Sequence, residues 1–527
     1  MKTTWMERII VGSCLLFLAG GVWLRFVHLG DQIYHNDEAW TGLWRSGHSV
    51  RDIRNDLCGR VSQASEWHNY LRLTPGRGLA ATISAVASDD PKQGPVYFGL
   101  LRLWVGLVGD SSAARRTLSV LFGLMLCPLA FWLARQLFSS QLPGWISAAL
   151  IAVSPAQILY SQDIRPYSML AAAVLLSSSA LLRAVRRKDP TTWSAYGATV
   201  IAGLYVHPLF ILVMISHAAY VILPCFMCGR ADSTWQTMLV RPFVGTILIA
   251  GLVFSPWIIV FALGWKSGLG GMAWLLHRIP FRYLAESWIT ACGRIFVDFT
   301  AAATAWPKTL LYSIITVLVI LSFAQLWKTQ PWRGAALSLL LFLVPFLVLV
   351  PADLLLGGQS STVDRYFIAA YLAAQLSLAF GLATAISSPK PLVCGLGAVL
   401  FVGILAGGAY SAWLNSRTDA PWIKGPAREH RRMADVIKAE TPALLVCDCK
   451  TIIRLLAFSP FLPRNVEVAV LQRTDRLANE LEEDRLQNFR SVFLFRGPVG
   501  SEFDGRLPVE PVPGASQLWR LQRRVQR

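Results

Sequence analysis

The sequence predicts an all-helical protein that crosses a membrane many times and carries a small α/β domain at its C-terminal end. Of its 527 residues, 54% are hydrophobic and only 15% are charged. Apolar stretches of about 17 to 25 residues, the length that crosses roughly 30 Å of hydrocarbon, recur from Ile9 to Tyr410. After Trp413 the pattern changes to short strands that alternate with helices. This composition excludes an ordinary soluble enzyme.

The apolar stretches correspond to about eleven transmembrane helices. The first lies within residues 1–27, where Lys2 and Arg8 precede the apolar run. Because no small-residue cleavage site follows, we expect this segment to remain as a span rather than to be removed as a signal peptide.

Basic residues gather in the short loops between the predicted spans. They include Lys2, Arg8, Arg135, Arg183, Arg186, Arg187, Lys188, Arg241, Lys328, Arg333 and Lys390. If the spans alternate in direction, these loops share one face, which the positive-inside rule assigns to the cytoplasm. Four longer segments, and the chain after Trp413, then lie outside: residues 28–112, 157–167, 264–308 and 351–365.

We place the domain boundary between residues 412 and 413. The membrane module, residues 1–412, includes the outer loops 28–112 and 264–308, and Val96–Val108 is expected to lie as a helix at the membrane interface. The C-terminal domain, residues 413–527, is predicted to be a small extracytoplasmic α/β domain. Its expected elements are helices over 427–440 and 475–489 and strands over 443–447, 466–471 and 491–495. It has no phosphate-binding glycine loop, and we assign it no catalytic role.

The net charge of +18 bears on the partners of the chain. In so hydrophobic a protein, we expect anionic membrane lipids and phosphate-bearing lipid substrates rather than nucleic acid. Most of the nine cysteines lie singly in apolar stretches and are expected to be buried. Cys58 and Cys292 would both lie outside the membrane and could form a disulfide. Cys447 and Cys449 are too close together and too isolated for a zinc site.

Two polar clusters follow predicted spans, and both fall on the outer side. The first is the pair Asp37-Glu38, and the second is the block Asp163–Tyr167, which reads Asp-Ile-Arg-Pro-Tyr. Charged groups beside so much hydrocarbon are costly, so they indicate a functional site. Adjacent carboxylates point different ways, so one can act as a base while the other orients it. Solvated helix caps are the structural alternative for both clusters.

Two further outer positions carry residues suited to a ligand. His207 ends a predicted span, although a lone histidine there is more often structural. Arg365, in Asp364-Arg365-Tyr366, opens a span, where it would anchor the helix or hold a phosphate with its planar fork.

A family resemblance rests on several blocks in a fixed order. They are Asp37-Glu38, Gly94-Pro95-Val96-Tyr97, Leu101-Arg102-Leu103-Trp104, Gly109–Arg116, Ser161–Tyr167, Tyr205-Val206-His207 and Arg365-Tyr366. Together they resemble the polyprenyl-phosphate-sugar-dependent glycosyltransferases of the GT-C fold. The resemblance covers roughly residues 5 to 410, and it is to the bacterial, family 39-like branch related to protein O-mannosyltransferases and lipid A aminoarabinose transferases.

The resemblance implies roles for particular residues. Asp37 is the catalytic carboxylate, with Glu38 beside it, and the block Asp163–Tyr167 lines the same cleft. Arg165 and Arg365 favour the lipid phosphate. The expected catalytic residues are Asp37, Glu38 and Asp163, and the expected substrate-binding residues are His35, Tyr97, Arg165, Tyr167, His207, Arg365 and Tyr366. The aminoarabinose enzymes carry a lysine before the proline in the block that here reads Gln93-Gly94-Pro95; Lys92 is displaced from that position, so this role is not carried over to it.

The expected reaction moves a sugar from a polyprenyl-phosphate donor to an acceptor hydroxyl. A carboxylate removes the proton of the hydroxyl, and direct displacement inverts the anomeric carbon. The site would face the periplasmic side of the inner membrane. The sugar and the acceptor (lipid, glycan or protein) stay open, as does a divalent cation held by Asp37, Glu38 and His35.

Two other functions are open. One is transport of a lipid-linked glycan. Two observations argue against it: polar residues concentrate at span ends, and no inverted repeat is visible. The other is a non-catalytic family member. The presence of both carboxylates and both arginines argues against it.

Overall fold

The structure is a computed structural model that describes residues 5–227, 236–265, 273–299, 305–418, 420–472, 486–496 and 509–522. Contacts divide the chain into two units. The first, here called the membrane unit, comprises residues 1–30, 90–97 and 116–418. The second, here called the sheet unit, comprises residues 31–89, 98–115 and 419–527. Most of the predicted outer loop 28–112 thus groups with the C-terminal region, whereas the sequence-based boundary cuts the chain once, at residue 412.

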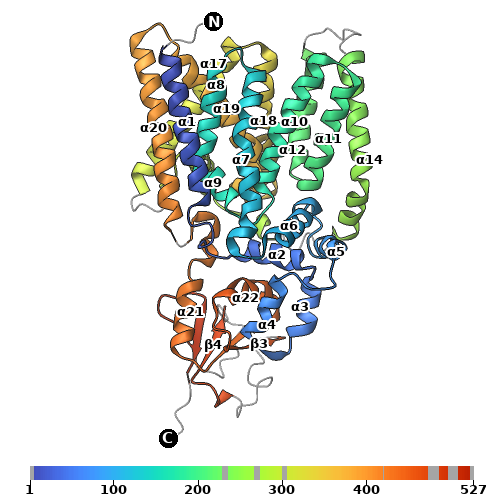
Figure 1. The fold of residues 1–527 in the computed structure, drawn as a ribbon, viewed down its shortest axis with the longest axis vertical. Coiled ribbons are helices and arrows are strands. Elements are labelled where there is room, and N and C mark those ends of the chain that lie inside the picture. Colours follow the sequence, from blue (N-terminus) through green and yellow to red (C-terminus); the bar gives the residue numbers. More distant parts are fainter. Residues whose placement is uncertain are drawn as a thin grey trace. The chain divides into compact units, whose positions relative to one another are not determined.

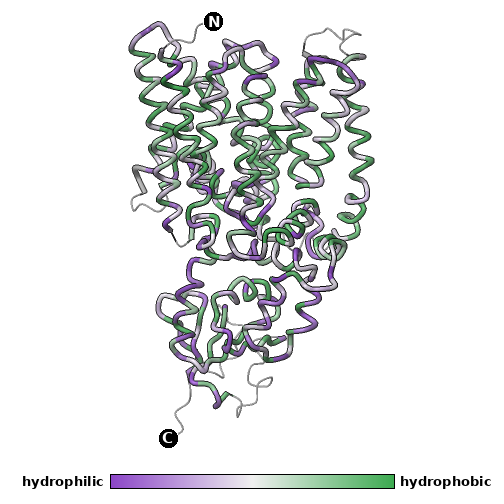
Figure 2. Tube along the Cα trace, viewed as in Figure 1, coloured by the Kyte–Doolittle hydropathy of each residue, from purple (hydrophilic) through white to green (hydrophobic). Residues whose placement is uncertain are grey.

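The membrane unit is a bundle of helices (Figure 1). Its helices are α1 (Trp5–Phe26), α7 (Ser112–Leu137), α8 (Leu142–Val153), α9 (Pro155–Ser161), α10 (Tyr167–Arg187), α11 (Pro190–Val206), α12 (Phe210–Met227), α14 (Arg241–Leu263), α16 (Phe281–Arg294), α17 (Ala305–Thr329), α18 (Trp332–Leu356), α19 (Ile368–Ile386) and α20 (Pro391–Ser416). Hydrophobic residues run along these helices, and hydrophilic residues gather at their ends (Figure 2).

The prediction of a polytopic membrane protein is confirmed. Among the described residues, eight helices are long and apolar enough to cross a membrane, or nine if α8 and α9, bent by 60° at their junction, form one span. Helix α11 packs against α10 and α14, and the shorter apolar helix α12 packs against α18. The predicted number of about eleven spans is thus higher than the eight or nine found among the described residues.

The bend between α8 and α9 positions the polar block that follows α9. Ser154 lies at the bend and caps α9, and its hydroxyl accepts from the amide of Gln157. The last carbonyls of α8 are satisfied by Arg25 of α1, whose guanidinium donates to Ala152 O at 2.6 Å and to Ile151 O at 3.1 Å. A break in a buried helix leaves carbonyl groups without hydrogen-bond donors, and here the buried arginine supplies those donors.

The sheet unit contains a six-stranded mixed sheet, order β1-β3-β2-β4-β6-β5. The strands are β1 (Arg60–Gln63), β2 (Ala443–Asp448), β3 (Glu467–Leu471), β4 (Ser491–Phe495), β5 (Val509–Pro511) and β6 (Leu518–Leu521). The helices are α2 (Asn36–Ser46), α3 (Val50–Leu57), α4 (Ala64–Trp67), α5 (Leu79–Asp89), α6 (Pro95–Val108, which begins in the membrane unit), α21 (His430–Ala439) and α22 (Ile452–Phe458). Strand β2 pairs in parallel with β3 and β4, and the other pairs are antiparallel.

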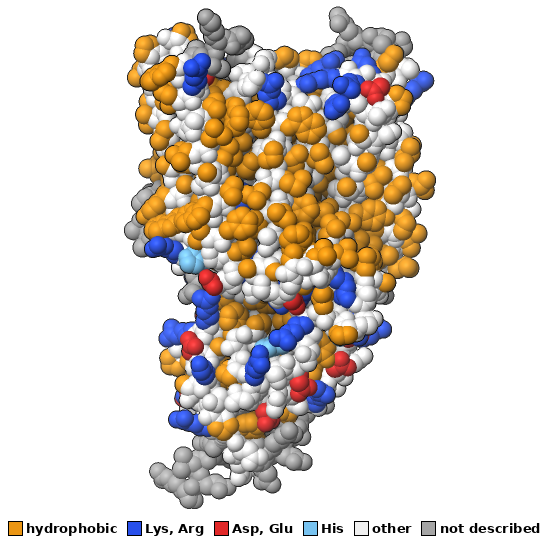
Figure 3. Space-filling model, viewed as in Figure 1, with side chains coloured by type: hydrophobic (Ala, Val, Ile, Leu, Met, Phe, Trp, Pro, Cys, Tyr) orange, Lys and Arg blue, Asp and Glu red, His pale blue; other side chains and the backbone are white. Residues whose placement is uncertain are grey.

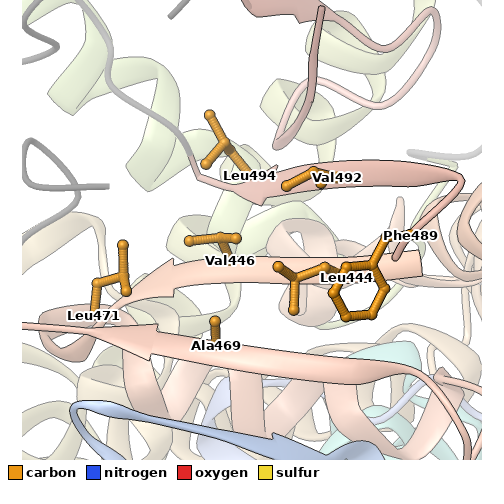
Figure 4. Close-up of a cluster of buried hydrophobic side chains, with 7 residues drawn as sticks. All are labelled: Leu444, Val446, Ala469, Leu471, Phe489, Val492 and Leu494. Atoms are coloured by element: carbon orange, nitrogen blue, oxygen red, sulfur yellow. The ribbon is translucent and has the colours of Figure 1, made fainter. Parts of the chain in front are cut away.

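The core of the sheet unit lies on the central parallel strands. It is formed by Leu444, Val446, Ala469, Leu471, Phe489, Val492 and Leu494 (Figure 4). The predicted strands over 443–447, 466–471 and 491–495 are confirmed as β2, β3 and β4, and the helix predicted over 427–440 is α21. Most of the helix predicted over 475–489, and parts of the outer loop 264–308, lie outside the described residues.

The predicted Cys58–Cys292 disulfide is wrong, because Cys58 is bonded to Cys449, 391 positions away. The sheet explains this pairing. β1 runs antiparallel to β3, so its first residue, Arg60, lies opposite Val470 at the carboxyl end of β3. β2 ends at the same edge, and Cys449 follows it directly. Cys292 lies in α16 as a free thiol.

Candidate functional site

The carboxylate pair of the sheet unit occupies the first turn of α2, which begins at Asn36 and ends before the left-handed Gly47. The positive end of the helix dipole stabilises carboxylates there. The side chain of Glu38 is fully buried, whereas Asp37 is partly exposed. The two groups therefore point different ways, as the sequence analysis expected, and Asp37 is the more exposed of the two.

Buried Glu38 is held by two basic side chains. Its Oε1 lies 3.3 Å from Nζ of Lys424, and its Oε2 lies 3.4 Å from Nδ1 of His35. Lys424 is itself buried, and Nζ also donates to Ile33 O at 3.2 Å. A charged pair that is shielded from water holds its geometry only because such additional hydrogen bonds satisfy it.

Sequence reasoning missed Lys424. It lies on a 3-10 segment, Trp422–Ala427, in the region to which no catalytic role was assigned. The 386 positions between Lys424 and Glu38 leave no local pattern that could have paired them.

Several hydrogen bonds fix the first turn of α2. The hydroxyl of Tyr34 donates to Glu38 O at 2.7 Å, and Thr41 Oγ1 donates to Asp37 O at 3.0 Å. Further along α2, buried Arg45 pairs with Asp110 at 2.8 Å, and Arg115 pairs with the same carboxylate at 2.6 Å. The block Gly109–Arg116 thus supplies a polar support for α2.

The polar block of the membrane unit links α9 to α10. Pro166 is the N-cap of α10, which begins at Tyr167. Asp163, Arg165 and Tyr167 are all buried. The block is tied to the end of α1 by Gln162, whose Nε2 donates to the carbonyl oxygens of α1 and of the loop after it at 3.0 to 3.3 Å.

Two guanidinium groups face one aromatic ring in the membrane unit. The Cζ of Arg165 lies 5.7 Å from the centre of the Tyr167 ring, and the Cζ of Arg365 lies 5.8 Å from it. The ring of His207 is 6.1 Å away from the same ring. Arg365 also lies 5.8 Å from the ring centre of Tyr366. The structure thus brings together five of the seven residues expected to bind substrate, from three separate stretches of sequence.

Arg365 has a sequence neighbour of opposite charge that is engaged elsewhere. Asp364 lies 3.7 Å from Arg294 of α16 and accepts from the hydroxyl of Tyr371 at 2.8 Å. Arg294 also lies 3.9 Å from Asp298, which accepts from Asn415 of α20. This network fixes the segment before α19.

The surroundings of His207 favour its neutral form. Burial, and then the positive charges of Arg165 and Arg365, lower the pKa of His207 from 6.5 to about 3. Its Nδ1 accepts from the amide of Leu209 at 3.1 Å. The proton of the neutral ring is therefore on Nε2, which can donate to an anionic ligand beside the two arginines.

Tyr97 supports the block from α6. Its hydroxyl lies 2.7 Å from Ser119 Oγ, and that hydroxyl donates to Arg165 O at 3.4 Å. A Cβ on Gly94 would lie 2.1 Å from Tyr205 O, so only glycine lets this segment approach the end of α11 just before His207. Lys92 pairs with Asp90 at 3.4 Å.

Arg165, Tyr167, His207, Arg365 and Tyr366 are here called the arginine cluster. A narrow apolar cavity adjoins this cluster. Its lining is mostly aliphatic and comes from α10, from α12 and the loop before it, and from the start of α19. Arg365 and Tyr366 also line the cavity. Its volume of about 10 Å³ holds roughly one water molecule.

The expected site residues thus form two groups. His35, Asp37 and Glu38 lie together in the sheet unit, and the arginine cluster with Asp163 lies in the membrane unit. That the two groups share one cleft stays a prediction. His35 and Glu38 could supply two ligands to a metal ion, although the Lys424 ammonium already neutralises Glu38.

Residues 91–260 match the model of the dolichyl-phosphate-mannose-protein mannosyltransferase family. Among solved structures, the chain is similar to ArnT from Cupriavidus metallidurans in the apo state, with 11% identity, and bound to undecaprenyl phosphate, with 12% identity. Both comparisons have a TM-score of 0.53 and cover 97% of this chain and 97% or 98% of the other. No protein of curated function matches the sequence. The chain has the GT-C fold, and the resemblance to GT-C glycosyltransferases is confirmed.

Proposed function

We propose that this membrane protein of GT-C fold transfers a sugar from a polyprenyl-phosphate donor to an acceptor hydroxyl on the extracytoplasmic face. The observation that carries the proposal is the pair of guanidinium groups, Arg165 and Arg365, at 5.7 and 5.8 Å from the centre of the Tyr167 ring, beside an apolar cavity. A lipid phosphate needs fixed positive charge next to a path for its hydrocarbon chain. The match to an ArnT bound to undecaprenyl phosphate supports this class of donor.

The arginines would act on the leaving group. When the bond between the anomeric carbon and the phosphate oxygen breaks, the phosphate takes the electron pair and gains negative charge. Preorganised cations in a water-poor site stabilise that charge without reorganising. The Nε2 proton of His207 would add a neutral donor to the same phosphate.

Asp37 would act on the acceptor. The acceptor oxygen attacks the anomeric carbon as the phosphate leaves, and its proton passes to Asp37. Attack opposite the leaving group inverts the anomeric configuration. Glu38, fixed by Lys424 and His35, would orient this turn of α2 rather than exchange the proton. The role of Asp163, buried beside Arg165, would be to line the same cleft.

The cavity beside Arg365 would have to widen when the donor binds. At about 10 Å³ it holds about one water molecule, which is much less than one isoprene unit needs. We therefore expect α10, α12 and the segment before α19 to separate as the prenyl chain enters.

Two observations support an extracytoplasmic site at the inner membrane. Disulfides persist in oxidising compartments, and Cys58–Cys449 closes the unit that contains Asp37. The basic short loops at the other ends of the spans favour the cytoplasm for that face.

The test uses purified protein in proteoliposomes with a labelled undecaprenyl-phosphate sugar. We expect Asp37→Asn to abolish transfer while the protein inserts and elutes like wild type, because the amide cannot accept the proton. The control is Asp435→Asn, an exposed carboxylate on α21. Full transfer by Asp37→Asn would remove Asp37 from the mechanism. If the wild type moved the lipid across the bilayer without consuming it, the protein would be a transporter instead.

The sugar and the acceptor can be identified together. Mass spectrometry of envelope lipids, polysaccharides and proteins from cells with and without the gene would reveal a missing glycoform. An unchanged envelope would favour a non-catalytic role.

A further inference from the structure

A second basic cavity lies at the opposite end of the helices from the arginine cluster. It has a volume of about 340 Å³ and is lined by the end of α7, the end of α10, α12 and the turn between α17 and α18. Helix α10 connects the two places, because it begins at Tyr167 and ends at Arg187. Its 21 residues span about 30 Å, so this cavity is separate from the proposed transfer site.

Three arginines from three helices surround the cavity: Arg135 of α7, Arg186 of α10 and Arg333 of α18. Arg186 donates to the carbonyl of Gln136, which fixes its guanidinium at the rim. No Asp or Glu belongs to the described residues that line the cavity. Basic side chains gather at this end of the membrane unit, next to hydrophobic helix flanks (Figure 3). The cavity is therefore suited to an anion.

The floor of the cavity is apolar. Phe138, Leu182 and Val185 are buried there, together with the ring of Tyr220. A soluble anion would gain nothing from such a floor, whereas a lipid would place its glycerol backbone and the first carbons of its chains on it.

An amide group in the cavity adds a preference for a hydroxyl. Gln330, after the last residue of α17, lines the cavity, and its buried Oε1 has no hydrogen-bond partner among the described residues. A buried acceptor without a donor costs about 1–3 kcal/mol, so a ligand that supplies an O–H group is favoured. An ammonium headgroup could also donate, but three arginines would repel it.

The cavity lies where lipid headgroups are expected. Helices α7, α10 and α17 end around it and α18 begins there. Exposed Trp332, an aromatic typical of the membrane interface, lies beneath the Arg333 guanidinium, 5.7 Å from ring centre to Cζ. This face is also the one that the basic loops assign to the cytoplasm.

We propose that this cavity is a binding site for an anionic phospholipid with a hydroxyl-bearing headgroup, of the phosphatidylglycerol type. The phosphodiester lies among Arg135, Arg186 and Arg333, and a headgroup hydroxyl donates to Gln330. The single negative charge of the bound phosphodiester reduces the repulsion among the three guanidinium groups, and the lipid links the ends of α7, α10 and α18. The site does not depend on the proposed transfer reaction.

The experiment measures lipid retained on the purified full-length protein by native mass spectrometry. The probes are phosphatidylglycerol, phosphatidylethanolamine and inorganic phosphate. The cavity variant is Arg135→Gln/Arg186→Gln/Arg333→Gln. The control is Arg183→Gln/Arg187→Gln/Lys188→Gln, which removes the same charge from exposed residues of the same face that do not line the cavity.

We expect the cavity variant to retain phosphatidylglycerol about 100-fold less well than wild type, since three arginines that each contribute about 1 kcal/mol to anionic lipid binding together contribute about 3 kcal/mol. The control should change little. Ser139→Trp, which fills the cavity from its exposed rim without changing charge, should lose the lipid too. Gel filtration identifies any variant that fails to fold.

Three results would overturn the proposal. Equal losses in the two triple variants would indicate general surface electrostatics. Equal retention of phosphatidylethanolamine would remove the preference for an anion, and tight binding of inorganic phosphate alone would assign the site to a soluble anion.

Discussion

Replacing Lys424 with methionine removes the ammonium group that pairs with Glu38 and keeps a side chain of similar length. The pair is sealed from water, because the side chain of Glu38 is fully buried and that of Lys424 is 1% exposed. Removing one partner of a buried ion pair costs about 3–5 kcal/mol, since the other charge stays buried and uncompensated. A whole domain is stable by only about 5–15 kcal/mol, so the sheet unit should lose a large part of its stability.

A double-mutant cycle separates the free-energy cost of leaving a buried charge without its partner from the cost of lost packing. Glu38→Gln alone should also destabilise, because it leaves the Lys424 ammonium without its carboxylate. The double variant Lys424→Met/Glu38→Gln removes both charges and should recover most of the loss. The matched control is Lys438→Met on α21, where the lysine is exposed and the cost should be below about 0.5 kcal/mol.

The assay is denaturant unfolding of the purified protein in nanodiscs, with limited proteolysis of the sheet unit as a second reading. Additive effects of Lys424→Met and Glu38→Gln would refute the reasoning, because independent sites add. A Lys424→Met variant as stable as the Lys438→Met control would refute it as well.

Three further predictions concern other parts of the molecule. Reducing the Cys58–Cys449 disulfide should destabilise the sheet unit by about 2–5 kcal/mol, which would be measured as a lower Tm in the presence of reductant. The Tm of a Cys58→Ser/Cys449→Ser variant should not change with reductant. Arg365→Gln should lower the transfer rate about 100-fold or more, and Arg365→Lys should restore only part of it because a planar fork is lost; an unchanged rate would exclude contact with the leaving group. The pKa of His207 is lowered to about 3, so as the pH falls the unfolded chain is protonated at this residue before the folded protein is. The free energy of unfolding should therefore decrease from pH 6.5 towards pH 3. In urea titrations at several pH values, His207→Gln should reduce this dependence on pH. An equal slope in both proteins would contradict that pKa.

Local patterns predicted much of the fold. The lengths of the apolar stretches identified the spans, and the buried runs at 443–447, 466–471 and 491–495 identified three strands, because burial and period are encoded within a few residues. The clustering of Arg165, Arg365 and His207 came from the family resemblance and not from any period.

The features that the sequence analysis missed are long-range pairings. Strand β1 joins a sheet built about 400 residues later, and Cys58 and Lys424 each find partners across 391 and 386 positions. A four-residue strand such as β1 has too few alternating positions to indicate its partner or its register. Lys424 looks like any surface lysine, because only its burial against Glu38 distinguishes it.

The way the sheet unit is assembled has a consequence for biosynthesis. Strand β1 and the turn that carries Asp37 emerge from the ribosome early, but β3, Cys449 and the Lys424 ammonium are synthesised only after the last helix of the bundle, α20. Until translation passes these residues, Glu38 has no lysine to neutralise it, and β1 has an open edge. A nascent or prematurely terminated chain would therefore sit in the bilayer with its acidic turn unfinished, which would keep partly made copies inactive.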